Sequence, residues 1–149
     1  MTVYRGQQAY TPKLSTSSYG NAWNDDNKID ITAALVAADE VILMEIPAGT
    51  RLTGLKYRAG DLDSGATLVA NLGYRSTHPE QRVAAAPSYF LNASAAFQAA
   101  QNGWVDLAFE PITFQENVQI VLKPTAPAVG LPAATAIWAI ASGRVVGVA

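Results

Sequence analysis

Val41-Ile42-Leu43-Met44-Glu45-Ile46-Pro47-Ala48-Gly49-Thr50 is the stretch of this chain that decides the fold. Its first six residues form a nearly continuous apolar run, which is typical of a strand buried on both faces. Pro47 and Gly49 then break the run, because proline and glycine favour turns. Apolar positions follow among polar ones at Leu52, Leu55 and Tyr57, so the sequence predicts a hairpin whose second strand covers 51–58.

Similar alternation of apolar and polar residues predicts further strands on both sides. They cover 28–32, 67–74, 88–91, 104–109, 118–123 and 135–148, the last being interrupted at Ser142-Gly143. One short helix is expected over 92–103, where Asn92 can cap a run of alanines that Asn102-Gly103 ends. Many short strands with frequent turn signals predict an all-β fold, namely a β-sandwich of the jelly-roll type with one short helix.

The first residues differ in composition from the rest, so we expect an extended N-terminal arm over 1–26 and a β-sandwich domain over 27–149. The arm is polar and shows no strand or helix periodicity, yet it contains aromatic residues, which interfaces favour. The aromatic residues predicted to contact a partner are Tyr4, Tyr10, Tyr19 and Trp23. The alternative is an arm that folds back over its own sandwich.

Composition excludes several classes of function. A chain of 149 residues can bury a core as one domain, and the absence of cysteine excludes disulfides, thiolate catalysis and cysteine-bound zinc. Ten basic residues against twelve acidic ones argue against a nucleic-acid surface. Only 15% of the residues are charged, which favours a protein that is packed against neighbours. The alternative is a monomer covered by Ser, Thr, Asn and Gln.

The N-terminal residues and the apolar runs bear on localisation. Met1 to Gln8 contains no apolar run that would form a signal peptide. The longest apolar stretches, such as 133–141, fall well short of the ~20 residues that cross a bilayer. We therefore expect a protein that is made in the cytoplasm and has no membrane partner.

Residues that could carry chemistry have simpler explanations. The lone His78 lies in a polar loop, where it lacks the further histidines that a metal site needs. Asp61 and Asp63 precede a strand and match only the start of a calcium loop, so we interpret them as turn residues. Glu45 is expected to pair with Arg51, Lys56 or Arg58 across the predicted hairpin. We therefore predict no enzyme activity, no cofactor and no metal.

Sugar binding is a further class to weigh, because sandwich lectins stack exposed aromatic rings on sugars. The aromatic residues available for this role are Trp23, Trp104, Tyr89 and Tyr74. Trp104 and Trp138, however, fall at strand positions that are expected to face the core.

Two stretches, 40–52 and 57–68, resemble a pattern of small head proteins of tailed bacteriophages. The pattern is a strand, the turn Pro47-Ala48-Gly49, a second strand, and then Asp61-Leu62-Asp63-Ser64-Gly65-Ala66-Thr67 opening the next strand. It covers about a quarter of the chain and specifies turns and strand ends. Such proteins include capsid decoration (cement) proteins, some of which are jelly rolls that sit on the outer shell as dimers.

The resemblance implies a structural protein of the virion, made in the host cytoplasm and placed on the outer surface of the capsid. There it would bridge neighbouring subunits of the major capsid protein, as a homodimer and without nucleic acid. A carbohydrate-binding sandwich, another virion component such as a head-tail or tail protein, and an enzyme of unknown type remain alternatives.

Overall fold

The strands of this chain differ in how regularly exposed and buried residues alternate, and β2 is the most regular. The structure is a computed structural model that describes residues 1–6, 22–78, 80 and 82–147. In β2 (Ala22–Ile31) every second side chain is buried, from Trp23 through Ile29 to Ile31. A strand of this pattern covers a core with one face and meets solvent with the other.

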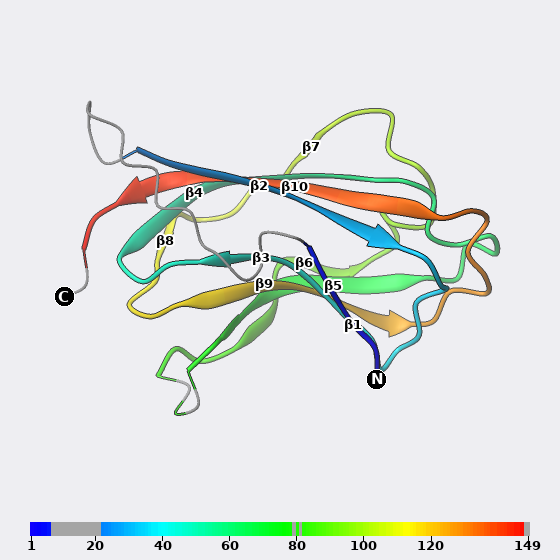
Figure 1. The fold of residues 1–149 in the computed structure, drawn as a ribbon, viewed down its shortest axis with the longest axis horizontal. Helices are drawn as coiled ribbons and strands as arrows, with labels where there is room; N and C mark the ends of the chain where they lie inside the picture. Colours follow the sequence, from blue (N-terminus) through cyan, green and yellow to red (C-terminus); the bar gives the residue numbers. More distant parts are fainter. Residues whose placement is uncertain (7–21, 79, 81, 148–149) are drawn as a thin grey trace.

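Two sheets pack face to face as a β-sandwich (Figure 1). Sheet A has the order β1-β3-β9-β5-β6, and sheet B has the order β2-β10-β4-β7, with β8 also paired to β4. The strands of sheet A are β1 (Val3–Arg5), β3 (Glu40–Ile46), β5 (Val69–Ser76), β6 (Ala86–Ser94) and β9 (Val118–Ala126). Those of sheet B are β2, β4 (Thr50–Ala59), β7 (Val105–Asp106), β8 (Ile112–Thr113) and β10 (Thr135–Val145). All pairings are antiparallel except that of β1 with β3.

The core lies between the sheets and draws on both. Its largest fully buried side chains include Trp23, Tyr57, Phe97 and Phe114. The strand predicted over 67–74 corresponds to β5, and Leu68, Ala70, Leu72 and Tyr74 are all buried, as the alternation of apolar and polar residues indicates. The predicted interruption near Ser142-Gly143 is also confirmed as a register shift in the pairing of β10 with β4.

The hairpin predicted over 41–58 is wrong. The turn at 47–50 exists, with Gly49 at a φ of 77°, a conformation that glycine adopts without strain. However, β3 belongs to sheet A and β4 to sheet B, so the chain crosses from one layer to the other at this turn. Apolar side chains line both strands, and packing them across the core buries more surface than pairing them edge to edge.

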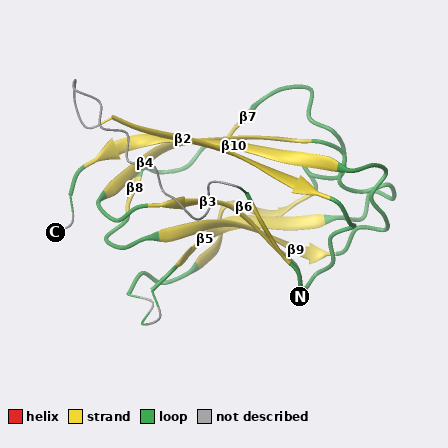
Figure 2. Ribbon diagram, in the orientation of Figure 1, coloured by secondary structure: helices red, strands yellow, loops and turns green. Residues whose placement is uncertain are grey.

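The helix predicted over 92–103 is also wrong: Figure 2 shows strands and loops, and the described residues contain no helix. β6 continues to Ser94, and turns follow. Phe97 is fully buried with its ring centroid 4.9 Å from that of Tyr57, while the Gln101 backbone N–H donates to the Ala59 carbonyl. These tertiary contacts outweigh the helix propensity of the alanines. In the part of the chain that the structure describes, no helix can cross a membrane.

Candidate interaction surface

The outer face of sheet B carries a row of alternating cations and aromatic rings. Lys28 on β2 and Arg58 on β4 lie directly opposite Trp138 on the central strand β10. The Lys28 ammonium is 5.9 Å from the centroid of the Trp138 ring, and the Arg58 guanidinium carbon is 5.8 Å from it. Both distances suit a cation–π interaction. The partly buried indole thus lies between a cation of β2 and a cation of β4.

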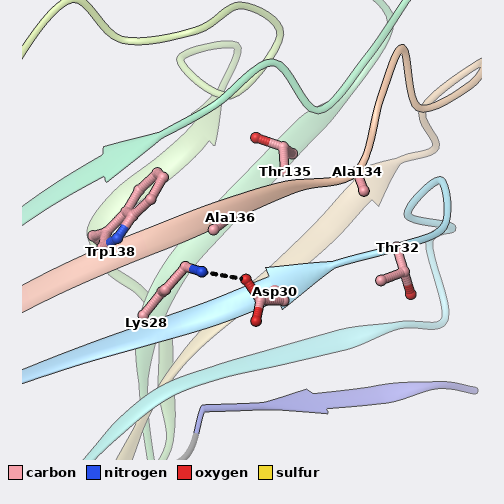
Figure 3. A pocket seen from close by; sticks show the side chains of 7 residues that line it. All are labelled: Lys28, Asp30, Thr32, Ala134, Thr135, Ala136 and Trp138. Carbon is pink, nitrogen blue, oxygen red and sulfur yellow. Dashed lines mark ion pairs between the residues drawn. The ribbon is translucent and has the colours of Figure 1, made fainter.

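A hollow of about 520 Å³ opens beside this tryptophan. Figure 3 shows Trp138 and Lys28 at one end of it, with Thr32 and Ala134 at the other. The hollow exists because Ala134 and Ala136 fill little space next to the large indole. Lys28 and Asp30 form an ion pair of 2.8 Å at its rim, but both side chains are more than half exposed, so the pair adds little stability.

Trp104 extends the same row toward the edge strand. Tyr57 pairs with Val105 and Lys56 with Asp106, and the last two side chains form an ion pair of 3.1 Å. Continuing this antiparallel register by one residue places Trp104 opposite Arg58. Trp104 is 46% exposed. The outer face of sheet B therefore presents the row Lys28, Trp138, Arg58 and Trp104 across its strands.

The prediction that Trp104 and Trp138 face the core is wrong. Trp138 lies between Ile137 and Ala139, which are both fully buried, so the alternation of a strand turns it outward. The sequence was ambiguous here because both faces of β10 carry apolar residues. Only the position of β10 in the centre of sheet B shows which of these faces is covered.

The predicted arm residues are placed differently from one another. Tyr4 lies in β1 and packs half-buried against the core, where burial and, to a smaller degree, Asp39 raise the pKa of its hydroxyl. Trp23 lies in β2 and is 2% exposed within the core, so its ring contacts its own domain. Tyr10 and Tyr19 lie outside the described residues, and their contact with a partner stays a prediction.

Asp63 organises the loop between β4 and β5. Its carboxylate accepts hydrogen bonds from the backbone N–H groups of Gly65 (3.0 Å), Thr67 (2.5 Å), Leu68 (2.6 Å) and Val129 (2.9 Å). Burial alone would raise the pKa of Asp63, but these four donors hold it far below the ordinary value. The interpretation of Asp63 as a turn residue is confirmed, and its oxygens are occupied by backbone donors rather than directed toward a metal.

Glu116 holds the loop between β5 and β6 in a similar way. Its carboxylate is buried and accepts a hydrogen bond from the Val83 backbone N–H. Burial alone would raise the pKa of Glu116, but hydrogen bonds from Ser76 and Val83, with His78 and Arg82 nearby, lower it. His78 itself is exposed in this loop, as predicted, and its Nδ1 accepts the Glu80 backbone N–H.

Glu45 does not make the predicted pair with a cation of β4, because β3 and β4 lie in different sheets. Its strand pairs with β9, where Gln119 is the backbone register partner of Glu45. Burial raises the pKa of the Glu45 carboxyl, and nearby Arg5 lowers it to a smaller degree. Glu40 of the same strand forms ion pairs with Arg75 at 2.7 Å and Lys123 at 3.8 Å. Among the described residues, no group of three or more His, Asp or Glu side chains could hold a metal ion.

Comparison with known proteins shows where this fold recurs. No protein family and no curated protein matches the sequence. A chain of the capsid of Ralstonia phage GP4 superposes with a TM-score of 0.68 and 18% identity, over 96% of this chain and 98% of that one. A chain of the cyanophage Pam1 capsid asymmetric unit superposes with a TM-score of 0.63 and 15% identity, over 92% and 96% of the two chains. The fold is therefore shared, almost from end to end, with chains of two phage capsids.

Proposed function

We propose that this protein is a structural, non-enzymatic component of a phage virion. It binds the outer surface of the capsid and stabilises the shell by bridging neighbouring subunits of the major capsid protein. The observation that carries the proposal is the likeness to chains in two phage capsids, because it spans both partners almost completely. A whole-chain match favours a protein that serves the same assembly over one that shares a small common motif.

The topology supports assignment to the jelly-roll class within the β-sandwiches. Successive strands from β2 to β5 alternate between the two sheets. Later strands then insert between them, β10 between β2 and β4 and β9 between β3 and β5. Such crossings between layers are typical of double-sheet jelly rolls. A sandwich of this kind offers two broad outer faces, one on each sheet, and a protein that bridges subunits needs more than one contact surface.

Bridging also explains how modest contacts can suffice. When one molecule touches two subunits, detaching it requires both contacts to open together, so the combined affinity exceeds either one. A homodimer on the capsid would double the number of attachments again. The low fraction of charged residues, 15%, suits a protein whose surface is largely covered in its assembled state.

Sedimentation with capsids that lack the protein tests the proposal. We expect co-sedimentation at a fixed ratio to the major capsid subunit, saturating as sites fill, and a higher temperature of capsid rupture. Sedimentation of the free protein reports whether it is a dimer. A protein that stays in the supernatant at all concentrations, with capsids of unchanged stability, would refute the proposed function.

The arm enters the proposal through Tyr10 and Tyr19 alone. Truncating residues 1–25 would also remove β1 and the buried Trp23, so it would confuse folding with binding. The double substitution Tyr10→Ala and Tyr19→Ala avoids this. We expect weaker capsid binding with unchanged thermal unfolding, and unchanged binding would count against the arm.

Carbohydrate binding is the second candidate function, because Trp104 and Trp138 lie on one outer face. The partly exposed Trp138 borders the hollow, which is also lined by the Lys28–Asp30 pair and by Thr32 and Thr135. A sugar that stacks on Trp138 would compete with the neighbouring Lys28 and Arg58 for the ring. Binding to a glycan array that is lost on Trp138→Ala would favour this candidate.

A further inference from the structure

Five of the ten basic residues of the chain lie on the outer face of sheet B. They are Lys28, Arg51, Lys56, Arg58 and Arg144, which we call the basic face. The same strands present three carboxylates outward, those of Asp26, Asp30 and Asp106. The face thus carries an excess of positive charge in a chain whose net charge is −2. This concentration is visible only once the strands are placed side by side.

Arg51 and Arg144 lie directly opposite each other on β4 and β10. Like charges in this position repel and cost stability. In the part of the chain that the structure describes, no carboxylate lies within ion-pair distance of either arginine. A repulsive pair that the described residues leave without a counter-charge is explained if an anionic partner supplies one.

Arg58 is the third arginine of the basic face without a carboxylate partner among the described residues, and its guanidinium lies over Trp138 instead. By contrast, Lys28 and Lys56 are paired with Asp30 and Asp106. Arg58 stands seven positions after Arg51 on β4. At about 3.3 Å per residue, the arginines without a carboxylate partner are spread over roughly 23 Å. That length matches a protein surface rather than a small ligand.

The remaining residues of this face are those that protein interfaces favour. Tryptophan and arginine dominate the residues whose loss most weakens protein–protein binding. Trp104 is 46% exposed, Trp138 is partly exposed, and the hollow beside Trp138 can receive a side chain of a partner. The three outward carboxylates argue against a nucleic acid, whose phosphates require an uninterrupted basic track.

We propose that the basic face docks onto an acidic protein surface, in which carboxylates pair with Arg51, Arg58 and Arg144 while the exposed indoles pack against apolar side chains. The inference rests on the proposed function, so the partner is an acidic, carboxylate-rich patch on the outside of the capsid shell. Sheet B, rather than sheet A, then faces the capsid, and Glu40 with its two cations faces away.

Sedimentation of charge variants with capsids that lack the protein tests this orientation. Arg51→Glu/Arg144→Glu and Arg58→Glu should each weaken capsid binding at least tenfold, and raised salt should weaken wild-type binding more than that of the variants. Arg144→Gln separates folding from binding, because relieving the repulsion with Arg51 should preserve or raise thermal stability while binding falls. The control is Arg82→Glu, which reverses a charge in the exposed loop between β5 and β6.

The outcomes distinguish the two proposals. If wild-type protein does not bind capsids, both proposals fail. If it binds and the variants of the basic face bind equally well at every salt concentration, the docking inference fails while the proposed function stands. If the variants instead lose binding to an anionic glycan and keep binding to capsids, the face serves a sugar and the docking inference is again wrong.

Discussion

Replacing Asp63 with alanine removes the shared acceptor of four backbone N–H groups. Two of them bind Oδ2, from Thr67 and Leu68, and two bind Oδ1, from Gly65 and Val129. A buried donor that loses its partner costs about 1–3 kcal/mol, and hydrogen bonds to a charged acceptor lie at the upper end. Gly65 and Thr67 are in exposed positions where water can replace the carboxylate, whereas Leu68 is fully buried. We therefore expect a loss of about 3–5 kcal/mol.

Urea unfolding measures this loss as a change in the extrapolated free energy of unfolding at constant m-value. For a domain of this size, a loss of 3–5 kcal/mol corresponds to a fall in Tm of roughly 6–20 °C. Asp61→Ala is the matched control, because Asp61 Oδ1 accepts only the N–H of Asp63, at 3.1 Å. The control should lose about 1 kcal/mol or less. Equal losses in the two variants would refute the assignment of Asp63 as the organiser of this loop.

The pH dependence of the free energy of unfolding provides a second check on the role of Asp63. The pKa of Asp63 is lower in the folded protein than in the unfolded chain, so its contribution to stability is fully present above the ordinary aspartate pKa. It is lost as pH falls through the folded value. Wild-type protein should therefore lose stability on acidification more steeply than Asp63→Ala, and parallel curves would contradict the reasoning.

Two further predictions concern the core and the loop between β5 and β6 that Glu116 holds. Phe97→Ala should lower the free energy of unfolding in urea by about 3–5 kcal/mol, because the side chain is fully buried. Trp138→Ala should lower it by only about 1 kcal/mol, because the ring lies on the outer face, outside the core between the sheets, and mainly loses its cation–π contacts. Similar losses in the two variants would show that Trp138 belongs to the core. Glu116→Gln should speed hydrogen exchange of the Val83 amide at neutral pH by about tenfold, since the charged acceptor is lost. The pKa of Glu116 is lowered in the folded protein, so the exchange rate of the wild type should approach that of the variant only as pH falls below the ordinary glutamate range. If neither the substitution nor the fall in pH changes the exchange rate of the Val83 amide, Glu116 does not hold this loop.

The alternation of neighbouring residues is enough to predict strands in this chain, and the structure agrees where one face of a strand is apolar and the other is polar. The buried face of 68–74 and the turn at Gly49 follow from alternation and from glycine chemistry alone. The helix over 92–103 was predicted from the same kind of local signal and is absent. Burial of the Phe97 ring against Tyr57 explains the difference, because the chain follows an irregular path to place this ring in the core. The gain from this burial outweighs the helix propensity of the alanines.

The candidate interaction surface was missed for a related reason. Its five basic residues come from three strands that are far apart in the sequence, β2, β4 and β10. Only the pairing of these strands brings Arg51 opposite Arg144 and Trp138 between Lys28 and Arg58. Conversely, the arm aromatic Trp23 had looked free for a partner and belongs to the core.

By itself, the sequence determined that this chain folds as an all-β sandwich with turns at Pro47-Ala48-Gly49-Thr50 and at Asp63, because alternation and turn chemistry act over a few neighbouring residues. The tertiary structure alone decided which sheet each strand joins, which face of an apolar strand is covered, and which charges meet. These properties depend on how much apolar surface the whole chain can bury at once. No single segment contains that information, and for this reason β3 and β4 lie in opposite layers while half of the cations share one face.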